Sequence, residues 1–573
     1  MYTLGINAAF HDSAACLVKD GQLVAAAEDE RFTHIKHGKR PIPFAAYELP
    51  YHAINYCLQS AGIRLHQVDH FAYSFDPYLL MPAGTGEEAE INLPLFPAGK
   101  EMPEKWLSPW DPLFLQAIAN APGQLTDGYP HHLQPNFRDA VINRRDQWHY
   151  LEHHLCHAAS AFLPSPYEEA AVLTIDGRGE KATTTFSTGA QHSLTRISQV
   201  NMPHSLGLLY ERITTHLGFL HSSDEYKVMA LASYGKPVYV QVLRDIIALS
   251  DNGSYQIADI PLEEILGPQR KKTDPFLAMH FDIAHSMQAV LQESVLQLAS
   301  WLKRETGSDN LCFAGGVALN CVLNATLRDA GIFRNIWVQP AAGDAGTALG
   351  AALWADARLR QRTSKDFVMD HAYWGPAYTD AEIEQFLQWT KTPYRKLDNI
   401  AEEAASLLAQ DKIIGWFQGR MEFGPRALGS RSILASPLHA DMQARLNEVK
   451  DREDFRPVAP VVTEEAAAEW FEGADYSPFM LFVYRVKEDK KALIPAVTHV
   501  DGTARIQTVN REQHPLYHEL LQAFEKKTGV PVLINTSFNT LGKPIVCTPR
   551  DALECFWSSP FDALVIGSFL IEK

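Results

Sequence analysis

The 573-residue sequence lacks long apolar runs and an excess of positive charge. No stretch approaches the roughly 18 apolar residues that a membrane helix requires. The chain has 51 lysines and arginines against 68 aspartates and glutamates, which gives a net charge of −17. An acidic exterior repels phosphate backbones and anionic lipids at long range. We therefore expect neither a nucleic acid nor a membrane as partner, whereas a local cationic pocket is compatible with this charge.

The sequence also lacks paired cysteines and a leader-like start. Its seven cysteines are an odd number without a C-x-x-C pair, and the opening MYTLGINAAFHDS has no basic stretch ahead of an apolar one. Disulfide-stapled and secreted proteins show the opposite pattern. We expect a cytoplasmic protein whose cysteines are reduced and lie mostly in the core.

Two similar strand patterns predict an α/β fold with an internal duplication. Strands are expected over residues 2–8, 14–18 and 22–27, and a polar tip, His11-Asp12-Ser13, separates the first two. About 160 residues later, AAVLTID and ATTTFST flank a second polar tip at residues 177–180. Two such units would face one shared cleft.

From residue 310 the chain alternates strands, glycine turns and helices, the pattern of α/β folds that bind ligands at the carboxyl ends of strands. LCFAGG precedes a helix expected to open at Val317, and NIWVQPA precedes Gly343, Asp344 and the helix TALGAALWA. Residues 357–378 resemble a linker, and a second domain is expected to begin near residues 367–371. That domain should continue with a helix near residues 401–410 and the strand KIIGWF.

Residues 76–147 interrupt the strand pattern. They contain ten of the 34 prolines, which argues against one continuous element. An inserted lobe or lid and a merely decorative insertion both fit this composition.

Histidines at helical spacing suggest a metal site. In LEHHLCHAASAF, His153 and His157 would lie one turn apart on one helix face, so both imidazoles could reach one ion. Asp176 and Asp344, each at a strand end beside a glycine, could add oxygen ligands. Such a set favours Fe, Mn or Zn over Mg or Ca. Surface or capping histidines are the open alternative.

Two turns could carry chemistry. His11 at the first polar tip could act as a general base toward a hydroxyl, because an imidazole titrates near neutrality. The glycine turn Gly315-Gly316, followed by Asn320, could admit a ligand phosphate to the backbone at a helix start. A purely structural histidine and a purely structural turn are the alternatives.

The segment from Arg420 to Arg456 is rich in cations interleaved with glycine and proline. Turn-borne arginines can converge on a small polyanion. Hydroxyl and amide side chains follow the strand VPVLI in INTSFNTLGKPIV, a combination that suits a phosphate and a small carbonyl group; scattered surface arginines are the alternative. The cations are Arg420, Arg426, Arg431, Arg445, Lys450, Arg452 and Arg456, with Arg505 further along.

Together these segments resemble the NodU/CmcH-type carbamoyltransferase family of antibiotic and nodulation-factor biosynthesis. The resemblance implies a TsaD-like domain of the actin/Hsp70/sugar-kinase superfold over residues 1–368, followed by a YrdC-like α/β domain over residues 369–573. The insertion 76–147 would shape the acceptor pocket. The matching pieces are GINAAFHDSAA, EDERFTHIKHG, HHLCHAASAF, TIDGRGE, YKVMALASYG, FAGGVALN, GDAGTALGAA, GRMEFGPRALGSRS, VKDREDFRPVAP, TARIQTV and LINTSFNTLGKPIV.

The resemblance also implies a reaction and a set of residues. The YrdC-like domain would convert carbamoyl phosphate and ATP into carbamoyl-adenylate, with Mg²⁺ as a companion of ATP, and the TsaD-like domain would transfer the carbamoyl group to a hydroxyl of a small secondary metabolite. By family position, the metal ligands, with iron as the expected metal, are His153, His157, Asp176 and Asp344. The transfer residues are His11 and Lys36, the carbamoyl-phosphate residues are Arg426, Lys450, Arg456, Arg505, Asn535 and Ser537, and the nucleotide contacts are Gly315, Gly316 and Asn320.

Other functions remain open at this level. The amino-terminal half also resembles a tRNA threonylcarbamoyl transferase, against which the acidic charge and the fused carboxyl half both count. A sugar-kinase-like ATPase would release ADP rather than AMP and pyrophosphate. A non-catalytic binding module would leave the arginine, NTSFN and metal-type sets without a purpose. A homodimer is the default expectation for the assembly.

Overall fold

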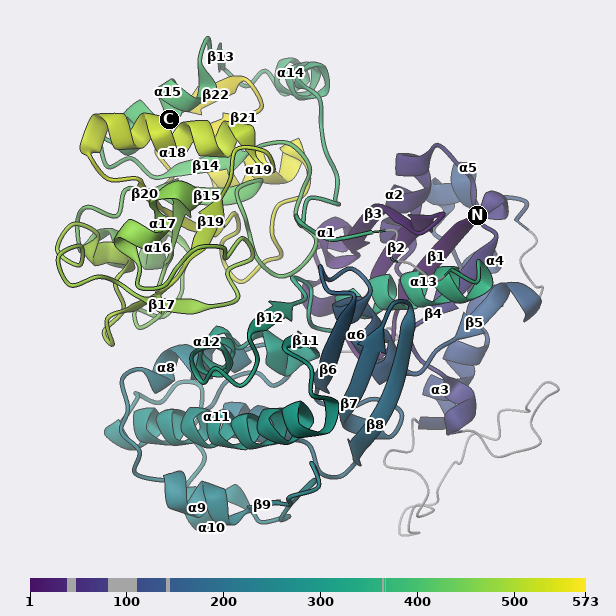
Figure 1. The fold of residues 1–573 in the computed structure, drawn as a ribbon. Helices are drawn as coiled ribbons and strands as arrows, with labels where there is room; N and C mark the ends of the chain where they lie inside the picture. The colour runs from purple at the N-terminus through teal and green to yellow at the C-terminus, as the bar shows by residue number, and fades with distance from the viewer. Residues whose placement is uncertain (39–47, 81–110, 141–144, 363–364, 366) are drawn as a thin grey trace.

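The computed structural model describes residues 1–38, 48–80, 111–140, 145–362, 365 and 367–573 (Figure 1). The proline-rich insertion is thus described only in part, since residues 81–110 and 141–144 lie outside this set. Its described part holds short helices rather than one long element, as the prolines predict. These are α3 (Asp111–Ala119), α4 (Ala121–Asp127) and α5 (Gln134–Phe137).

Two lobes with the same strand order make up the amino-terminal part of the described chain. In each, three antiparallel strands are followed by two parallel ones, so the predicted duplication is confirmed. The first sheet runs in the order β3 (Gln22–Glu28), β2 (Ala14–Lys19), β1 (Tyr2–Asn7), β4 (His70–Tyr73) and β5 (Trp148–Tyr150). The second runs β8 (Ser193–Asn201), β7 (Ala182–Ala190), β6 (Glu169–Ile175), β11 (Asn310–Ala314) and β12 (Asn335–Val338).

Two helices, α6 (His153–Phe162) and α13 (Ala345–Leu359), pack against each other between the lobes. Glycines permit this close approach. A Cβ at Gly350 of α13 would lie 1.9 Å from the carbonyl oxygen of Cys156, and one at Gly5 of β1 would lie 1.9 Å from that of Ala348. The same packing brings the amino-terminal ends of α6 and α13 close together.

Further helices cover the two sheets (Figure 1). The long helix α11 supplies much of the core of the second lobe, and α2 supplies part of the core of the first. The remaining elements of this part are α1 (Glu30–Thr33), α2 (Tyr51–Ala61), α7 (Leu206–His216), α8 (Glu225–Ala232), α9 (Val240–Asp245), β9 (Ile247–Leu249), β10 (Tyr255–Ile257), α10 (Leu262–Leu266), α11 (Ala278–Thr306) and α12 (Cys321–Asp329).

The turn after β11 differs from its prediction. A 3₁₀ turn, η7 (Gly316–Leu319), replaces the start of the helix expected at Val317, and α12 begins at Cys321. The cause is Asn320, whose side chain accepts a hydrogen bond of 3.0 Å from the Leu323 amide and so caps the helix. Gly315 has φ +95°, a conformation that favours glycine, and its Cα lies against β6.

The carboxyl-terminal region forms a mixed sheet of eight described strands. Apolar cores lie on both of its faces, one of them under α15 and α18. The strand order is β13 (Arg395–Lys396), β22 (Phe569–Glu572), β21 (Ala563–Ile566), β14 (Ile414–Phe417), β15 (Arg431–Ala435), β20 (Val532–Ser537), β16 (Ala459–Thr463) and β19 (Gln507–Val509), while β17 (Val483–Arg485) and β18 (Thr503–Arg505) pair separately. The helices are α14 (Asp380–Trp389), α15 (Ile400–Leu408), α16 (Met442–Val449), α17 (Glu464–Trp470), α18 (Pro515–Thr528) and α19 (Pro549–Trp557).

The expected helix and strand at the start of this region are α15 and β14, but α14 was not predicted. The described residues between α13 and α14 contain neither helix nor strand. The predicted linker, residues 357–378, lies there except for its first three residues, which belong to α13. All seven cysteines are free and six are buried, as expected. Within the described ranges, no helix is long and apolar enough to cross a membrane.

The carboxyl-terminal region contacts the first lobe through buried polar groups. The Gly424 amide donates to Glu28 over 2.8 Å, and the Arg31 guanidinium donates to the Gly424 carbonyl over 2.9 Å. Both hydrogen bonds are shielded from water, so they fix the loop between β14 and β15 against β3 and α1. That loop carries several of the predicted arginines.

Candidate functional site

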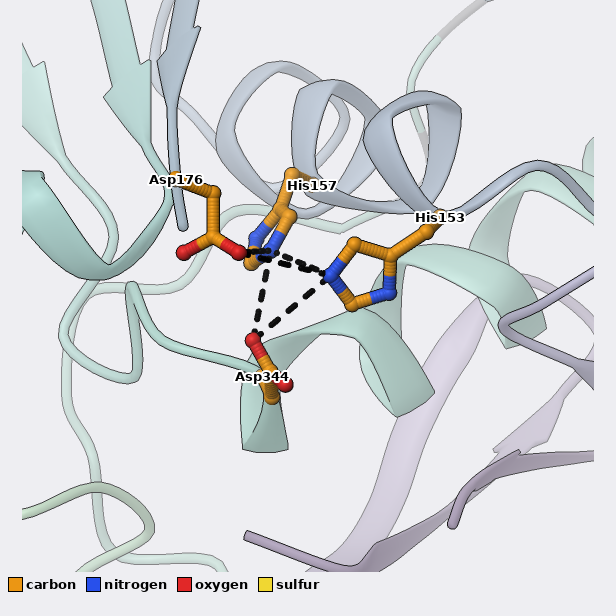
Figure 2. A group of neighbouring side chains, drawn as sticks. All are labelled: His153, His157, Asp176 and Asp344. Carbon is orange, nitrogen blue, oxygen red and sulfur yellow. Dashed lines mark hydrogen bonds and ion pairs between the residues drawn. The ribbon is translucent and has the colours of Figure 1, made fainter. Parts of the chain in front are cut away.

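Four side chains meet in a buried cluster between the two lobes, which we call the His/Asp cluster (Figure 2). His153 and His157 lie one turn apart at the start of α6, Asp176 follows β6, and Asp344 precedes α13. The Nε2 atoms of the two histidines are 3.1 Å apart. One possible ligand atom from each of the four residues lies within 4.8 Å of the other three. The predicted two-histidine, two-aspartate set is therefore assembled.

The chemistry of this cluster fits a metal ion. Asp344 is 1% exposed, yet neither of its carboxylate oxygens has a hydrogen-bond donor among the described residues. The carboxylate faces the imidazoles of the two cluster histidines, each 3.6 Å from Oδ1, and a buried carboxylate needs such positive charge because an unpaired one costs several kcal/mol. Two imidazole lone pairs also repel each other unless a cation or proton lies between them. Mixed imidazole and carboxylate ligands suit a divalent transition metal.

The charges in the cluster depend on one another. Burial lowers the pKa of His153, but the carboxylates of Asp344 and Asp176 outweigh burial and hold that pKa well above its usual range. Burial raises the pKa of Asp176. His153, whose Nε2 lies 3.7 Å from Asp176 Oδ2, and the other nearby histidines outweigh burial and lower that pKa strongly. The aspartates therefore stay ionised, as metal ligands must be.

Two neighbours position the ligands. The Gly316 amide donates to Asp176 Oδ1 over 2.6 Å, which leaves Oδ2 facing the histidines. Glu180 of the second polar tip accepts the His153 amide over 3.0 and 3.1 Å and so supports the start of α6. The histidine between the ligands, His154, bonds Thr174 Oγ1 over 2.8 Å instead.

The predicted base lies beside this cluster. His11 Nδ1 is 3.6 Å from Asp344 Oδ2 and 2.9 Å from Asp12 Oδ2. The other Asp12 oxygen contacts His37 Nδ1 at 2.8 Å. Burial raises the pKa of Asp12, but His37 and His11 outweigh burial and hold it well below its usual range. An ionised Asp12 favours the proton of His11 on Nδ1, which makes Nε2 the basic atom.

A second cluster, the arginine cluster, gathers positive charge in the carboxyl-terminal region. Its side chains come from the loop after β14, the end of α16, the loop that follows it, and β18. Three guanidinium nitrogens, Arg426 Nε, Arg452 Nη2 and Arg505 Nε, are buried without a hydrogen-bond acceptor among the described residues. The members are Arg426, Lys450, Arg452, Arg456 and Arg505.

Mutual repulsion among these cations lowers the pKa values of three of them. Burial and then Arg505 lower the pKa of Arg426 to about 9. Burial and then Arg456 lower the pKa of Arg452 to about 9 as well. Lys450 is only 6% exposed, and burial, Arg452 and Arg456 hold its pKa well below its usual range. Buried cations without a counter-charge raise the free energy of the folded protein, and a bound anion would lower it again.

The polar strand residues line one side of the arginine cluster. The Lys450 ammonium lies 3.2 Å from Ser537 Oγ and 2.7 Å from Asn539 Oδ1. Asn535 donates to Gln507 Oε1 over 2.7 Å, and its own oxygen is a buried acceptor without a described donor. Ser537 thus lies beside Lys450 at the end of β20, while Asn535, two residues earlier in that strand, is held by Gln507 and by the Ala427 carbonyl.

Not every cation of the arginine-rich segment converges. Arg420 donates to the carbonyl of Trp374 over 2.9 Å, and Arg431 is buried in β15 with its guanidinium on backbone carbonyls and 3.7 Å from the Phe417 ring centroid. Arg445 lies within α16 and donates to the Asp411 carbonyl over 3.3 Å. These three therefore hold the fold, and the expectation that the cations all lie on turns is wrong for Arg431 and Arg445.

The turn η7 touches both clusters. Its Gly316 amide bonds the ligand Asp176, and its Leu319 carbonyl accepts from Arg426 over 3.4 Å. Asn320 caps α12 and also pairs with Gln288 over 2.8 Å. The predicted nucleotide-contact segment thus lies between the His/Asp cluster and the arginine cluster.

Sequence reasoning left several site residues unassigned. In the sequence analysis Asp12 is only part of the first polar tip, Arg452 is only one of several cations, and His37 has no role. Tyr226, inside the matching piece YKVMALASYG, contacts both Lys36 and Arg456. Asp12 follows His11 directly, which is a usable signal, whereas nothing in the local pattern marks Tyr226.

Comparison with known proteins decides the family. A model described as "Carbamoyltransferase N-terminus" matches residues 2–83 and 124–353, and "Carbamoyltransferase C-terminus" matches residues 405–573. The chain belongs to the NodU/NolO carbamoyltransferase family. The nodulation protein NolNO of Sinorhizobium fredii is 40% identical over 99% of this chain and 80% of its own length. Nodulation protein U of Rhizobium tropici is 40% identical over 48% of this chain and 45% of its own.

A relative of unknown function and two solved structures complete the comparison. An uncharacterised Synechocystis protein is 40% identical over 100% of this carbamoyltransferase and 97% of its own length. Component A of (R)-2-hydroxyglutaryl-CoA dehydratase from Acidaminococcus fermentans covers 63% of this chain and 99% of its own with 13% identity and a TM-score of 0.32, and P. abyssi Sua5 covers 28% and 43% with 16% identity and a TM-score of 0.21. At such TM-scores the fold rests on the strand order alone.

Proposed function

We propose that this carbamoyltransferase is an ATP-dependent O-carbamoyltransferase that activates the carbamoyl group at the arginine cluster and transfers it beside the His/Asp cluster. The observation that carries the proposal is the pair of buried clusters of opposite charge, joined by η7. The arginine cluster suits a carbamoyl donor that carries phosphate, and the His/Asp cluster suits a metal cation next to the base His11. The YrdC-like assignment of residues 369–573 is part of this proposal.

The first half-reaction takes place at the arginine cluster. Its cations bind carbamoyl phosphate, which water cleaves into carbamate and inorganic phosphate. The cations then hold the carbamate against ATP. A carbamate oxygen attacks the α-phosphorus, and pyrophosphate leaves. Arg426 and Arg456 neutralise the phosphates, while Asn535 and Ser537 hold the small carbamoyl end. The glycine turn at Gly316 contributes close backbone approach to the nucleotide.

The second half-reaction takes place at His11. Its Nε2 accepts the proton of the acceptor hydroxyl as that oxygen attacks the carbamoyl carbon, and AMP leaves. Asp12 holds the required tautomer, and Lys36 offsets the charge of the leaving phosphate. A divalent transition metal, iron by family resemblance, bound by the His/Asp cluster would supply a Lewis acid that orients the acyl phosphate.

The acceptor is a hydroxyl of a small molecule, and we propose that the insertion 76–147 shapes its pocket. Part of that insertion lies outside the described residues, so the proposal rests on its position: its described part begins beside the second polar tip, where the Asp76 amide donates to Glu180 over 2.7 Å. Exchange of the insertion between relatives should change acceptor choice. An unchanged acceptor profile would refute this role.

One assay tests the adenylation step without knowledge of the acceptor. The protein is incubated with ATP and carbamoyl phosphate, and pyrophosphate is measured against a reaction that lacks carbamoyl phosphate. The proposal requires pyrophosphate that depends on carbamoyl phosphate. ADP in its place would favour a kinase-like ATPase, and the absence of both products would defeat the adenylation reading.

A further inference from the structure

Tyr226, in the first turn of α8, lies between the two halves of the proposed reaction. Lys36 Nζ is 5.8 Å from the centroid of its ring, and Arg456 Cζ is 4.7 Å from the same centroid. Both separations fall within the roughly 6 Å range of a cation–π contact. A single aromatic ring therefore contacts a residue predicted for transfer and a member of the arginine cluster.

The residues around Tyr226 are anchored on both sides. Ser223 Oγ lies 3.0 Å from His37 Nε2, and His37 in turn bonds Asp12 next to His11. Lys227 Nζ lies 2.9 Å from Glu453 Oε1, and Glu453 is 3.6 Å from Arg456. The segment from Ser223 to Lys227 is thus fixed to the first lobe at one end and to the carboxyl-terminal region at the other, so the ring between them is held in place.

Electrostatics place the tyrosine close to further members of the arginine cluster. Burial and like charges lower the pKa values of Arg426 and Arg452, and Tyr226 opposes that lowering at both residues. Tyr226 thus contacts Arg456 directly and acts electrostatically on two further members of the arginine cluster. Its contact with Lys36 places the ring between that lysine and Arg456.

We propose that Tyr226 is a positioning residue that closes the passage between the two sites, so that the activated carbamoyl group reaches His11 without loss to water. This inference rests on the proposed function. A mixed anhydride of carbamate and phosphate is hydrolysed readily, and exclusion of water is a general way to protect such an intermediate. The ring contacts Lys36 and Arg456 at the same time, which a smaller side chain cannot do.

The test follows pyrophosphate release over time with ATP and carbamoyl phosphate as the only substrates. In the wild type, the protected intermediate stays bound, so pyrophosphate appears as a burst of about one per chain followed by slow release. In Tyr226→Ala the burst remains, but the subsequent release accelerates about fivefold or more, because the intermediate is lost to water and the site turns over again.

Two matched variants serve as controls, one for the aromatic ring of Tyr226 and one for loss of a tyrosine that contacts the carboxyl-terminal region. Tyr226→Phe keeps the ring and should behave as the wild type. Tyr234→Ala removes a tyrosine that also reaches the carboxyl-terminal region, through a 3.4 Å hydrogen bond from its hydroxyl to the Phe455 carbonyl, and should leave the slow phase unchanged. Retained metal content in all variants shows that α8 and the lobes have folded.

The remaining outcomes are distinguishable. An unchanged slow phase in Tyr226→Ala, or fast continuous release by the wild type, would overturn the role of Tyr226 while the adenylation step stands. Loss of the burst in Tyr226→Ala would also overturn it, because the tyrosine would then belong to the activation step. No pyrophosphate from the wild type would defeat the proposed function itself.

Discussion

The His/Asp cluster and the arginine cluster solve opposite electrostatic problems in one protein. In the first, buried oxygen and nitrogen lone pairs face one another, and Asp344 has no hydrogen-bond donor among the described residues. In the second, buried N–H groups of Arg426, Arg452 and Arg505 lack acceptors in the same set. Neither arrangement is stable without a partner of opposite charge. Buried polar groups left unsatisfied by the fold therefore indicate where ligands bind and of which charge.

The two clusters also differ in how the chain builds them. Regular elements supply the His/Asp cluster, since α6, the end of β6 and the start of α13 converge through the duplicated fold. Loops and one short strand supply most of the arginine cluster, and a hydrogen bond from Arg426 joins it to the Leu319 carbonyl of the second lobe. A metal site needs fixed geometry, whereas an anion tolerates several arrangements of guanidinium groups.

The largest expected effect is on the His/Asp cluster itself. His153→Ala removes one of two imidazoles at 3.1 Å and should reduce bound transition metal from about one per chain to near zero, as measured by elemental analysis. His154→Ala is the control, because His154 bonds Thr174 and not the cluster. Iron retained by His153→Ala would mean that the four residues are not the ligands.

Substitution of the base separates the two half-reactions. His11→Asn should lower carbamoylation of a hydroxylated acceptor, found with a panel of metabolites, by about 10²–10⁴-fold, because general-base catalysis is lost. Pyrophosphate release without acceptor should stay within about twofold of the wild type, since the arginine cluster is unchanged. If His11→Asn lost both activities, the division between the clusters would be wrong.

The converse variant acts on the arginine cluster. Arg456→Ala removes one cation of the arginine cluster, so pyrophosphate release should fall on the order of 100-fold while metal content is unchanged. Arg445→Ala, in the same sequence segment but bonded to the Asp411 carbonyl, should behave as the wild type. Normal pyrophosphate release by Arg456→Ala would contradict the assignment.

The smallest expected effect is a change in metal affinity caused by a substitution in η7, the turn between the two clusters. A Cβ at Gly316 would lie 3.0 Å from Asp176 Oδ1, so Gly316→Ala should displace that ligand and weaken metal binding about tenfold, as loss of a supporting contact does. At Gly343, beside Asp344, a Cβ would meet only Leu319 Cδ1 at 3.6 Å, so Gly343→Ala should leave metal affinity unchanged. Equal affinities in a metal titration of both variants would show that η7 does not position Asp176.

The duplicated fold and the candidate metal ligands were accessible from the sequence because their signals are local. Strand patterns around the two polar tips, and histidines four residues apart, follow from secondary-structure periodicity. The capping signals Asn320 and Thr379 with Glu382 would have corrected the start of α12 and revealed α14, since side chains that bind free helix amides mark helix starts.

The contacts between clusters were not accessible in this way. Tyr226 acts through Lys36 and Arg456, which come from distant parts of the chain, and only the assembled lobes bring them to one ring. Arg431 and Arg445 were wrongly grouped with the ligand-facing cations for a related reason. Composition cannot distinguish a cation that binds backbone carbonyls from one that faces a ligand.

Acceptor-free pyrophosphate release in His153→Ala, measured beside Arg456→Ala, tests the central claim that the two clusters carry separate half-reactions. The account predicts release within about twofold of the wild type in His153→Ala, and loss on the order of 100-fold in Arg456→Ala. Equal loss of pyrophosphate release in both variants would contradict it.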